Sequence, residues 1–544
     1  MKKLCLFFFL FLTTFAFSQE DAWVYFNAKA NSQSYYESPL LMLSQRALDR
    51  RTNQSIALDF MDIPVNKDFV SQVKLVSGIT VMAKSKWLNA IHVRGTQTAI
   101  NSIKDFAFVD KIDFANKTLN LGAKTVKAGK LAKVTSVKEQ SKTKRIKADY
   151  TYGTSANQIQ MLNGQLLHQQ NYTGSGRIIA IMDAGYPGVD SALPFQRLKD
   201  NNQILGGYDF VSRSENFYTG NSHGTSVLST MGGYKENALV GTAPDASYYL
   251  FITEDTTSEN PIEESLWVEA AEKADSLGVD VINTSLGYFE FDNSTYNHTY
   301  SEMNGKTAFM SRGAEIAFSR GMIIVTAAGN EGGTGNPYIA VPADAVSVLA
   351  VGAVNATEVR ASFSSIGPSF DGRIKPDVMA QGVSTVLSDE FGNIITSNGT
   401  SFSSPIMAGI IASFWQAFPN KTNKEIRQLI LESADRFTNP TNQYGYGIPD
   451  FSLALNKGTL NVNQFSTTSF VLYPNPTTDF VTVSFPESFN KGKVIIYTFS
   501  GQKILERDLS ANSDSIPLHS LSNGVYIYKI ESDGFSKTGK IIKQ

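Results

Sequence analysis

The sequence predicts an α/β domain with a three-layer parallel sheet, preceded by a small α+β unit and followed by a small all-β sandwich. Between residues 150 and 456, buried-strand runs alternate with helical patterns, which is typical of parallel sheets with helices on both faces. After Asn456, short strands are separated by Pro, Asn, Ser and Gly, as in β-sandwiches. A chain of 544 residues is also too long for a single core.

The first folded unit, residues 19–112, combines strand-like runs with amphipathic helices. In the stretch 66–76, Phe69, Val73 and Val76 recur on one helical face. Alternating elements of this kind favour one layer of helices on one sheet. The predicted strands are 22–26, 79–82, 88–93 and 106–112, and the predicted helices are 66–76 and 98–104.

The central segment, residues 149–456, carries the longest apolar runs, and the C-terminal segment, residues 468–544, carries only short ones. In the central segment we expect strands at 177–182, 247–252, 279–283, 322–326 and 346–354, and helices at 263–277, 314–320 and 404–418. A linker at 457–467 then precedes seven strands expected at 470–473, 480–485, 493–498, 502–508, 515–517, 524–530 and 534–542.

Residues 1–18 have the features of a secretory signal peptide. Lys2 and Lys3 precede an apolar run over residues 4–17, and the run ends in a small-x-small pattern at Ser18. The run is too short to span a bilayer comfortably, and no other stretch suggests a membrane span. Cleavage after Ser18 would remove the only cysteine, Cys5, so disulfides would not stabilise the exported chain.

Charge is distributed unevenly although the whole chain carries a net charge of only −2, which implies no nucleic-acid partner. Residues 19–148 contain 21 Lys and Arg against 11 Asp and Glu, whereas residues 149–456 contain 16 against 32. Opposite charge favours docking of the two segments, although each surface could equally be solvated separately. Residues 113–148 have the composition of a flexible basic linker, and we expect proteolytic processing near residues 142–147.

Three polar residues occupy positions at which hydrolytic chemistry can be built. Asp183 directly follows a predicted strand, His223 stands at a predicted helix start, and Ser401 precedes an apolar helix. A serine hydroxyl needs an adjacent base to become a nucleophile, and a helix N-terminus favours developing negative charge. Taken singly, each residue is explained as well by a turn, a cap or an incidental surface position.

Asn330 is a fourth candidate, in the sequence Ala328-Gly-Asn330 after another predicted strand. Acyl transfer requires a fixed hydrogen-bond donor for the oxyanion of the tetrahedral intermediate, and an asparagine amide supplies one. The ordinary alternative is a turn, in which Gly-Asn is common.

Taken together, these positions resemble the motifs of subtilisin-like serine peptidases, the S8 family. The catalytic residues would occur in the order Asp, His, Ser, which is the subtilisin order. The motifs that carry the resemblance are 181–185, 223–225, 285–287, 328–330 and 399–401, and two further signatures are 241–246 and 375–380.

The resemblance implies a secreted serine endopeptidase that acts through an acyl-enzyme intermediate. Ser401 would attack the scissile carbonyl, His223 would accept and return the proton, and Asp183 would orient the imidazole. Asn330 and the backbone N–H of Ser401 would hold the oxyanion. The implied substrate-binding residues are Ser285, Leu286, Gly287 and Gly329.

Two departures from the family pattern concern the catalytic motifs, and a third concerns metal binding. Ala184 replaces the usual Ser or Thr, and Ser226 follows the His-Gly-Thr motif; neither change removes a catalytic atom. The stretch 234–239 lacks the asparagine-rich loop that binds calcium in many relatives. We therefore expect no cofactor and no metal ligand set.

A polar insertion at 289–307 offers oxygens for calcium, although a solvated loop explains it better. Its candidate oxygen ligands are Asp292, Asn293, Asn297 and Glu302.

The flanking segments also resemble known domains. Residues 19–112 resemble the inhibitory pro-domain of the family in layout, which implies a zymogen inhibited by its own pro-domain. Residues 468–544 resemble the type A C-terminal sorting domain of Bacteroidetes proteins, through the stretches 472–476, 524–526 and 540–543. This likeness implies recognition by the type IX secretion machinery, and a secreted or outer-membrane-surface location.

Two other function classes remain open from the sequence. The first is a catalytically inactive binding protein on the same fold, although no member of the expected triad is missing. The second is an adhesive or carbohydrate-binding protein that acts through its terminal β-domain. That domain shows no aromatic platform with paired carboxylates. We expect protein or peptide substrates but cannot name them from motifs alone.

Overall fold

The computed structural model describes residues 18–30, 32–120 and 150–459, and in the C-terminal part residues 471–473, 475–484, 491–510, 515–532 and 535–544. Most of the signal peptide, most of the basic linker with its processing zone, and most of the second linker lie outside these residues. The chain divides into two compact units, Met1–Gly458 and Thr459–Gln544. No helix in the described ranges is long and apolar enough to cross a membrane.

A seven-stranded sheet in the order β13-β12-β11-β10-β5-β9-β6 forms the centre of the first unit. Every neighbouring pair is parallel, which confirms the predicted fold class. The strands are β5 (Ile178–Asp183), β6 (Ile204–Asp209), β9 (Ser247–Ile252), β10 (Val281–Thr284), β11 (Ile323–Ala327), β12 (Leu349–Val354) and β13 (Val378–Gln381).

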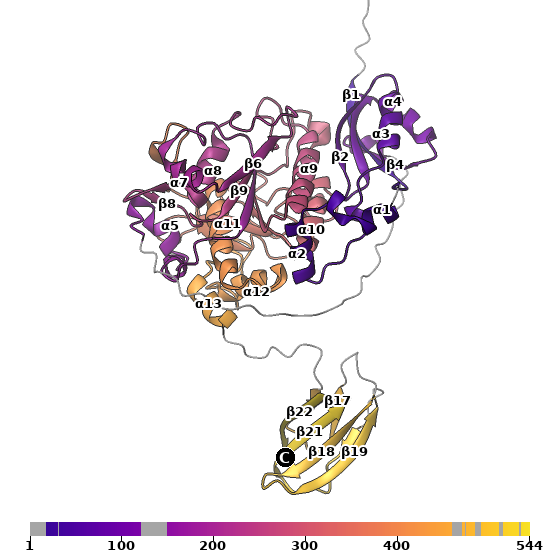
Figure 1. The fold of residues 1–544 in the computed structure, drawn as a ribbon, viewed down its shortest axis with the longest axis vertical. Helices are drawn as coiled ribbons and strands as arrows, with labels where there is room; N and C mark the ends of the chain where they lie inside the picture. Colours follow the sequence, from indigo (N-terminus) through magenta and orange to yellow (C-terminus); the bar gives the residue numbers. More distant parts are fainter. Residues whose placement is uncertain are drawn as a thin grey trace, which may run out of the picture. The chain divides into compact units, whose positions relative to one another are not determined.

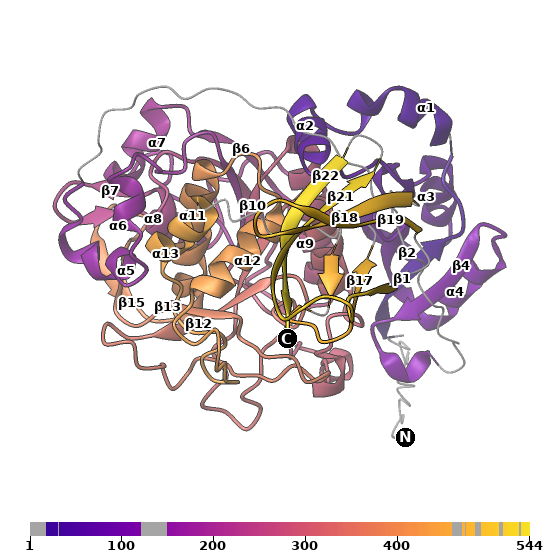
Figure 2. The same ribbon diagram turned by 90° about the horizontal axis from the view of Figure 1, so that it is seen from below.

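Two hydrophobic cores lie on the two faces of this sheet, because side chains alternate along each strand. In β5, Ile179 and Ile181 belong to one core, whereas Ile178, Ala180 and Met182 belong to the other. Helices α8 (His223–Gly232) and α11 (Thr400–Ala417) cover the first face, and α9 (Ile262–Leu277) and α10 (Phe309–Ser319) cover the second (Figures 1 and 2).

Shorter elements complete the domain around the sheet. They are α5 (Ala156–Gln160), α6 (Gln165–His168), α7 (Gln196–Asp200), β7 (Tyr234–Lys235), β8 (Leu239–Val240), β14 (Thr385–Ser388), β15 (Ile394–Ser397), α12 (Asn423–Ser433) and α13 (Phe451–Thr459). The insertion at 289–307 contains two short 3₁₀ turns, Ser294–Tyr296 and Tyr300–Glu302.

The N-terminal part of the first unit, residues 19–30 and 32–120, is called the N-terminal unit below. It contains an antiparallel sheet in the order β2-β3-β1-β4. Its strands are β1 (Gln19–Phe26), β2 (Ile79–Ser85), β3 (Ala90–Thr96) and β4 (Val109–Phe114), and its helices are α1 (Ser32–Glu37), α2 (Gln45–Asn53), α3 (Lys67–Lys74) and α4 (Gln97–Ser102). The sheet and helix α3 agree with the layout expected from the sequence. Helices α1 and α2 were not predicted, because neither carries an apolar stripe; α2 buries Arg50 and Arg51 instead.

The C-terminal unit consists of two antiparallel sheets, ordered β16-β17-β20 and β19-β18-β21-β22. Both contribute to one core, in which Val481 and Ile516 from the first sheet join Ile496 and Ile530 from the second. The predicted all-β class is therefore confirmed. The strands are β16 (Val471–Tyr473), β17 (Phe480–Ser484), β18 (Lys491–Thr498), β19 (Lys503–Ser510), β20 (Ser515–Pro517), β21 (Gly524–Ser532) and β22 (Phe535–Lys543).

Candidate active site

Parallel strands bring the candidate residues to one edge of the sheet, because all their carboxyl ends point the same way. Asp183 ends β5, the segment Ser285–Gly287 follows β10, and Asn330 lies three residues beyond the end of β11. Helix α8 begins at His223, and Ser401 is the second residue of α11. Five segments that are distant in sequence thus converge at this edge.

Asp183, which is buried, and His223, which is partly exposed, form a hydrogen-bonded pair. His223 Nδ1 lies 2.7 Å from Asp183 Oδ1, and the carboxylate also accepts from the Ala184 N–H at 2.8 Å. Burial opposes charge on the imidazole, but the neighbouring Asp183 carboxylate outweighs it and raises the pKa of His223 above its usual value. A carboxylate at Nδ1 fixes the tautomer in which neutral His223 exposes an unprotonated Nε2.

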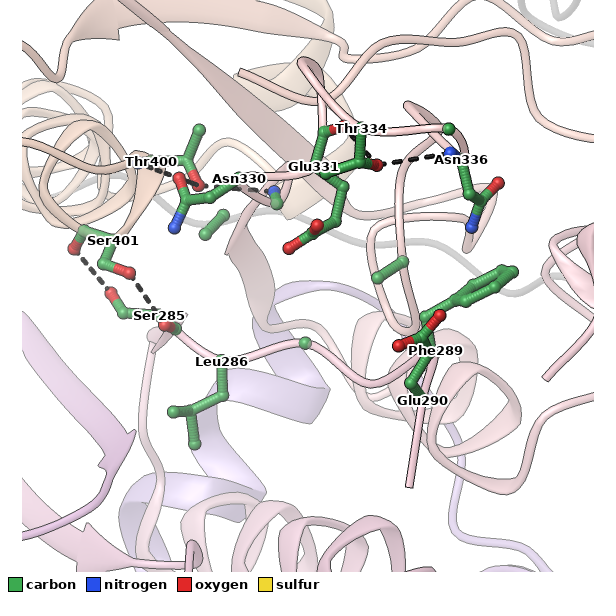
Figure 3. A pocket seen from close by; sticks show the side chains of 15 residues that line it. Ser285, Leu286, Phe289, Glu290, Asn330, Glu331, Thr334, Asn336, Thr400 and Ser401 are labelled. Carbon is green, nitrogen blue, oxygen red and sulfur yellow. Dashed lines mark hydrogen bonds between the residues drawn. The ribbon is translucent and has the colours of Figure 1, made fainter. Parts of the chain in front are cut away.

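Ser401 lies on the first turn of α11, directly after Gly399 and Thr400. Gly399 has φ 152°, which a residue with a side chain rarely adopts. The Ser401 hydroxyl donates to the Ser285 carbonyl at 3.2 Å, and the Ser285 hydroxyl donates to the Ser401 carbonyl at 2.8 Å (Figure 3). In the described part of the chain, Ser401 Oγ makes no hydrogen bond to His223 and is bonded to Ser285 instead.

Pro405 explains why the Ser401 carbonyl is available to Ser285. In an α-helix that carbonyl would accept from the N–H four residues later, but residue 405 is a proline inside α11 and has no N–H. The Ser285 hydroxyl takes the vacant position. We had predicted a helix start at 404, and the structure corrects it to Thr400, because one missing donor near a helix start does not end the helix.

Asn330 is oriented by Thr400. Its Oδ1 accepts from the Thr400 N–H at 2.9 Å and from the Thr400 hydroxyl at 3.0 Å. These bonds assign the amide oxygen, so the Nδ2 group faces the side on which Ser401 lies (Figure 3). Within the described residues Nδ2 has no hydrogen-bond partner, which leaves a free donor next to the candidate nucleophile.

A cavity of about 630 Å³ opens beside Ser401. It brings together Ser401, Asn330 and all four residues expected to bind substrate, whereas Asp183 and His223 are not part of its wall. His223 lies next to Phe402, the residue after Ser401, with ring centroids 5.8 Å apart. The lining residues are Ser285, Leu286, Gly287, Phe289, Glu290, Ala327, Gly329, Asn330, Glu331, Thr334, Gly335, Asn336, Ala340, Thr400 and Ser401.

Nine of the fifteen lining residues had no assigned role in the sequence analysis, and Thr400, Glu331 and Glu290 are among them. Thr400 lies inside the motif 399–401 without a role of its own, and Glu290 falls in the segment interpreted as an insertion. Glu331 directly follows Asn330 in the sequence, and this adjacency to a candidate residue is the one signal that could have found it. The sequence carries no comparable signal for Glu290.

The described residues contain one group of acidic side chains close enough to hold a metal ion. Glu254, Glu259 and Glu263 have ligand oxygens within 4.8 Å of one another. Burial, followed by the nearby Glu259, raises the pKa of Glu254 to about 7, and burial followed by Glu254 raises the pKa of Glu263 to about 9. Glu263 already accepts backbone N–H bonds from Asp255 and Asn260. The expectation of a metal-free protein stays a prediction.

In the insertion, the candidate calcium ligands contact protein groups. Asn297 accepts from the Phe291 N–H at 2.8 Å, and Asn293 accepts from the Thr295 N–H at 3.1 Å. Glu302 pairs with Lys117 of the N-terminal unit at 2.7 Å. Asp292 accepts from the Glu259 N–H at 3.1 Å. These contacts stabilise the loop without a cation.

Three family models match this chain. The model of the subtilase family matches residues 174–447, and the model of the peptidase S8 propeptide domain of Bacteroidota matches residues 21–133. The model of the secretion system C-terminal sorting domain matches residues 471–544. The three matches follow the order of the folded parts along the chain.

Individual relatives resemble the central domain. Subtilisin NAT of Bacillus subtilis subsp. natto is 35% identical over 293 residues, which cover 53% of this chain and 68% of the relative. Subtilisin of Bacillus pumilus is 34% identical over 293 residues, 53% of this chain and 94% of the relative. The thermostable alkaline protease of Halalkalibacterium halodurans is 29% identical over 291 residues, 53% of this chain and 70% of the relative.

Proposed function

Because the chain belongs to the subtilase family, we propose that Ser401, His223 and Asp183 are the residues with which it hydrolyses peptide bonds. The protein is a secreted serine endopeptidase that carries an S8 propeptide. Its sorting domain directs export by the type IX system to the surface or the medium. The observation that supports the residue assignment most strongly is the 2.7 Å bond between His223 and Asp183, beside a cavity lined by Ser401.

Ser401 attacks the scissile carbonyl and forms an acyl-enzyme. Neutral His223 accepts the hydroxyl proton at Nε2, and the imidazolium is stabilised by the Asp183 carboxylate at Nδ1. The same proton then passes to the leaving amine. Water repeats the sequence on the acyl-enzyme, and Ser401 is regenerated. Since Ser401 Oγ donates to Ser285 in this structure, the hydroxyl first turns from that carbonyl towards His223.

The oxyanion of each tetrahedral intermediate is held by Asn330 Nδ2 and the Ser401 backbone N–H. The Thr400 contacts hold the Asn330 amide in place before substrate arrives. Donors that are fixed in advance need no reorganisation when charge develops, and this is the main source of their effect.

The substrate backbone pairs with the segment Ser285–Gly287, as an added strand. Gly287 is exposed, and a side chain there would approach the Val341 carbonyl to 3.2 Å. Glycine therefore keeps this edge open to an extended peptide. Gly329, whose φ is 109°, belongs to a different chain segment that lines the same cavity. It likewise adds no side chain to the cavity.

The N-terminal unit acts as an intramolecular inhibitor until it is cut off. It contacts α9 of the catalytic domain through buried groups: Glu272 accepts from the Ser85 hydroxyl at 2.6 Å and from the Trp87 N–H at 3.0 Å. Arg50 and Arg51 both bind Asp275, whose side chain is fully buried. Loss of the covalent linkage by cleavage between Lys133 and Tyr150 removes the high effective concentration of the inhibitor.

The assignment is tested by comparing Ser401→Ala with Ser403→Ala in the processed enzyme. Ser403 lies in the same helical turn, and its hydroxyl donates to the Thr400 carbonyl at 3.0 Å. Peptide hydrolysis should disappear in the first variant and persist in the second. Hydrolysis by Ser401→Ala at a rate near that of the unmodified enzyme would contradict the proposal, and an inactive but folded unmodified enzyme would favour a binding protein.

A further inference from the structure

Helix α2 of the N-terminal unit contacts the catalytic domain at the edge of the sheet opposite the candidate active site. Arg46 and Gln54 donate to the carbonyls of Gly278 and Gly321 at 2.9 and 2.8 Å. These two glycines lie in the turns that lead from α9 into β10 and from α10 into β11. The turns precede their strands, whereas the candidate active site follows the strand ends, so this contact is separate from the candidate active site.

Three arginines of α2 enter one acidic surface of the catalytic domain, formed by Asp275, Asp280 and neighbouring carbonyls and called the arginine site below. Arg46 pairs with Asp280, whereas Arg50 and Arg51 both pair with Asp275. The Arg51–Asp275 distance is 2.8 Å, and the Asp275 side chain is fully buried under this contact. The arginine site therefore holds several guanidinium groups side by side.

The negative potential of the arginine site comes from the catalytic domain itself. Asp275 lies in the last turn of α9, which contains no basic residue, and the C-terminus of a helix carries a partial negative charge. The Gly176 carbonyl accepts from Arg46 at 2.9 Å, and the Val279 carbonyl accepts from Arg50. Carboxylates, carbonyls and a helix end therefore all favour a cation at this place.

Removal of the N-terminal unit leaves the arginine site without its cations. Asp280 is fixed from within the catalytic domain, because it accepts from the Ile178 N–H at 2.9 Å and from Arg177 at 3.3 Å. In the described part of the chain, the cations that pair with Asp275 all belong to the N-terminal unit, and they are Arg50, Arg51 and Lys86. Processing therefore exposes a carboxylate that the catalytic domain does not neutralise.

We propose that the arginine site of the processed enzyme binds helical polypeptide segments that carry arginines four positions apart. Arg46 and Arg50 have this spacing, which places them on one face of α2. Arg51 adds a second donor to the same carboxylate, although it also pairs with Asp62 of its own unit. The planar guanidinium suits a site of carboxylates and carbonyls because it directs several N–H groups at once, which an ammonium group does not.

The ligand is defined by this chemistry, whether the helix belongs to the released N-terminal unit or to a protein substrate. The inference rests on the proposed function, because the site is vacated only when the N-terminal unit is cut off. It concerns a surface on which polypeptides are held rather than the bond that is broken.

The test measures binding of a fluorescent peptide, residues 43–56, to processed enzyme whose Ser401 carries a phosphonate label and which therefore does not cleave the peptide. One peptide should bind per chain. Replacing its three arginines by lysine should weaken binding by about 10-fold, and Asp275→Asn in the enzyme should have a similar effect of about 10-fold. Glu358→Gln, at an exposed position outside the arginine site, removes the same charge and should bind like the unmodified enzyme.

The arginine and lysine peptides keep the test decisive if Asp275→Asn does not fold. Equal binding of the two peptides, or no binding of the arginine peptide at millimolar concentration, would overturn this inference alone. A phosphonofluoridate that does not label Ser401 would contradict the residue assignment of the proposed function. A chain that is never cut would contradict the proposed processing, and the inference with it.

A second measurement distinguishes the two sources of the helix. Two peptide substrates share one cleavage sequence, and one of them also carries residues 43–56 on a long flexible linker. A lower KM for the tethered substrate, abolished by Asp275→Asn, would show that protein substrates use the arginine site through a raised effective concentration. Equal KM values, together with binding of the free peptide, would assign the site to the released N-terminal unit.

Discussion

His223 Nδ1 donates to Asp183 Oδ1 over 2.7 Å, and the Asp183 side chain is completely buried. The bond holds the imidazole in one tautomer and favours its protonated form. It is the one contact of the expected triad that is already formed in this structure, because the Ser401 hydroxyl bonds to Ser285 instead.

The pH dependence of kcat/KM should show an acid limb with an apparent pKa above the free-imidazole value of about 6.5. His223 acts as a base only when it is neutral, and the Asp183 carboxylate raises its pKa against the effect of burial. Activity is therefore lost as the pH falls through the raised pKa. Initial rates between pH 5 and 9 measure this limb; a flat profile, or a midpoint below 6.5, would contradict the role of His223.

Replacing Asn330 by alanine should lower kcat by about 10²–10³-fold, a magnitude that is the known effect of removing the oxyanion-hole asparagine of subtilisin rather than a value obtained from this structure. Thr400→Val should have a smaller effect, about 3–10-fold, because it removes only the hydroxyl donor at 3.0 Å and leaves the backbone donor. Steady-state kinetics on one peptide measure both. Equal effects of the two variants would show that Asn330 does not act through its amide nitrogen.

Added as a separate chain, residues 19–148 should inhibit the processed enzyme, and Arg51→Ala should weaken inhibition by about 10²–10³-fold. Arg51 pairs with Asp275 at 2.8 Å in a fully buried position, and its removal takes away one of the two arginines that bind this buried carboxylate. Lys67→Ala, at an exposed position, is the control and should inhibit like the unmodified segment. The measurement is the inhibition constant of each segment.

The salt dependence of the same inhibition separates the two interpretations of the charge asymmetry. If the basic segment is steered to the acidic domain, its association rate should fall steeply with added salt, since exposed charges are screened beyond about 8–10 Å at physiological ionic strength. An association rate that ignores salt would mean that the two charged surfaces are only solvated. No inhibition at all would exclude an inhibitory role for the segment.

Removal of the N-terminal unit should depend on Ser401. The mature N-terminus of the active enzyme should lie between Lys133 and Tyr150. Ser401→Ala, expressed in the same way, should remain uncut in that interval. Intact-mass measurement of both proteins shows whether each chain has been cut in this interval. Cleavage of the Ser401→Ala chain at the same bond would assign processing to another protease.

The sequence predicted the sheet and the candidate site best where the local residue pattern alone indicates the structure. Strand Ser247–Ile252 was predicted with its observed bounds, because a short, largely apolar run of that length is typical of a buried strand. The site residues could be predicted because short motifs surround them, and chain topology then places the strand ends at one edge. The side-chain hydrogen bonds between Ser285 and Ser401 depend on atoms that no motif specifies.

The features that the sequence did not predict have more than one physical cause, and contact with distant parts of the chain is the first. Helix α2 was missed because its buried face consists of Ala47, Arg50 and Arg51, and the two arginines bind Asp275, more than two hundred positions away. The start of α11 was misplaced because Pro405 argues for a break when it is considered alone. The two glutamates of the cavity could not be grouped, since forty residues separate them.

Covalent labelling with a phosphonofluoridate, followed by peptide mapping, tests the central claim most directly. The processed enzyme should lose activity in proportion to label bound, and the label should map to Ser401 with one equivalent per chain. His223→Ala should label far more slowly, because the hydroxyl then has no base. Label on another serine, or full activity after stoichiometric labelling of Ser401, would contradict the assignment of Ser401 as the nucleophile.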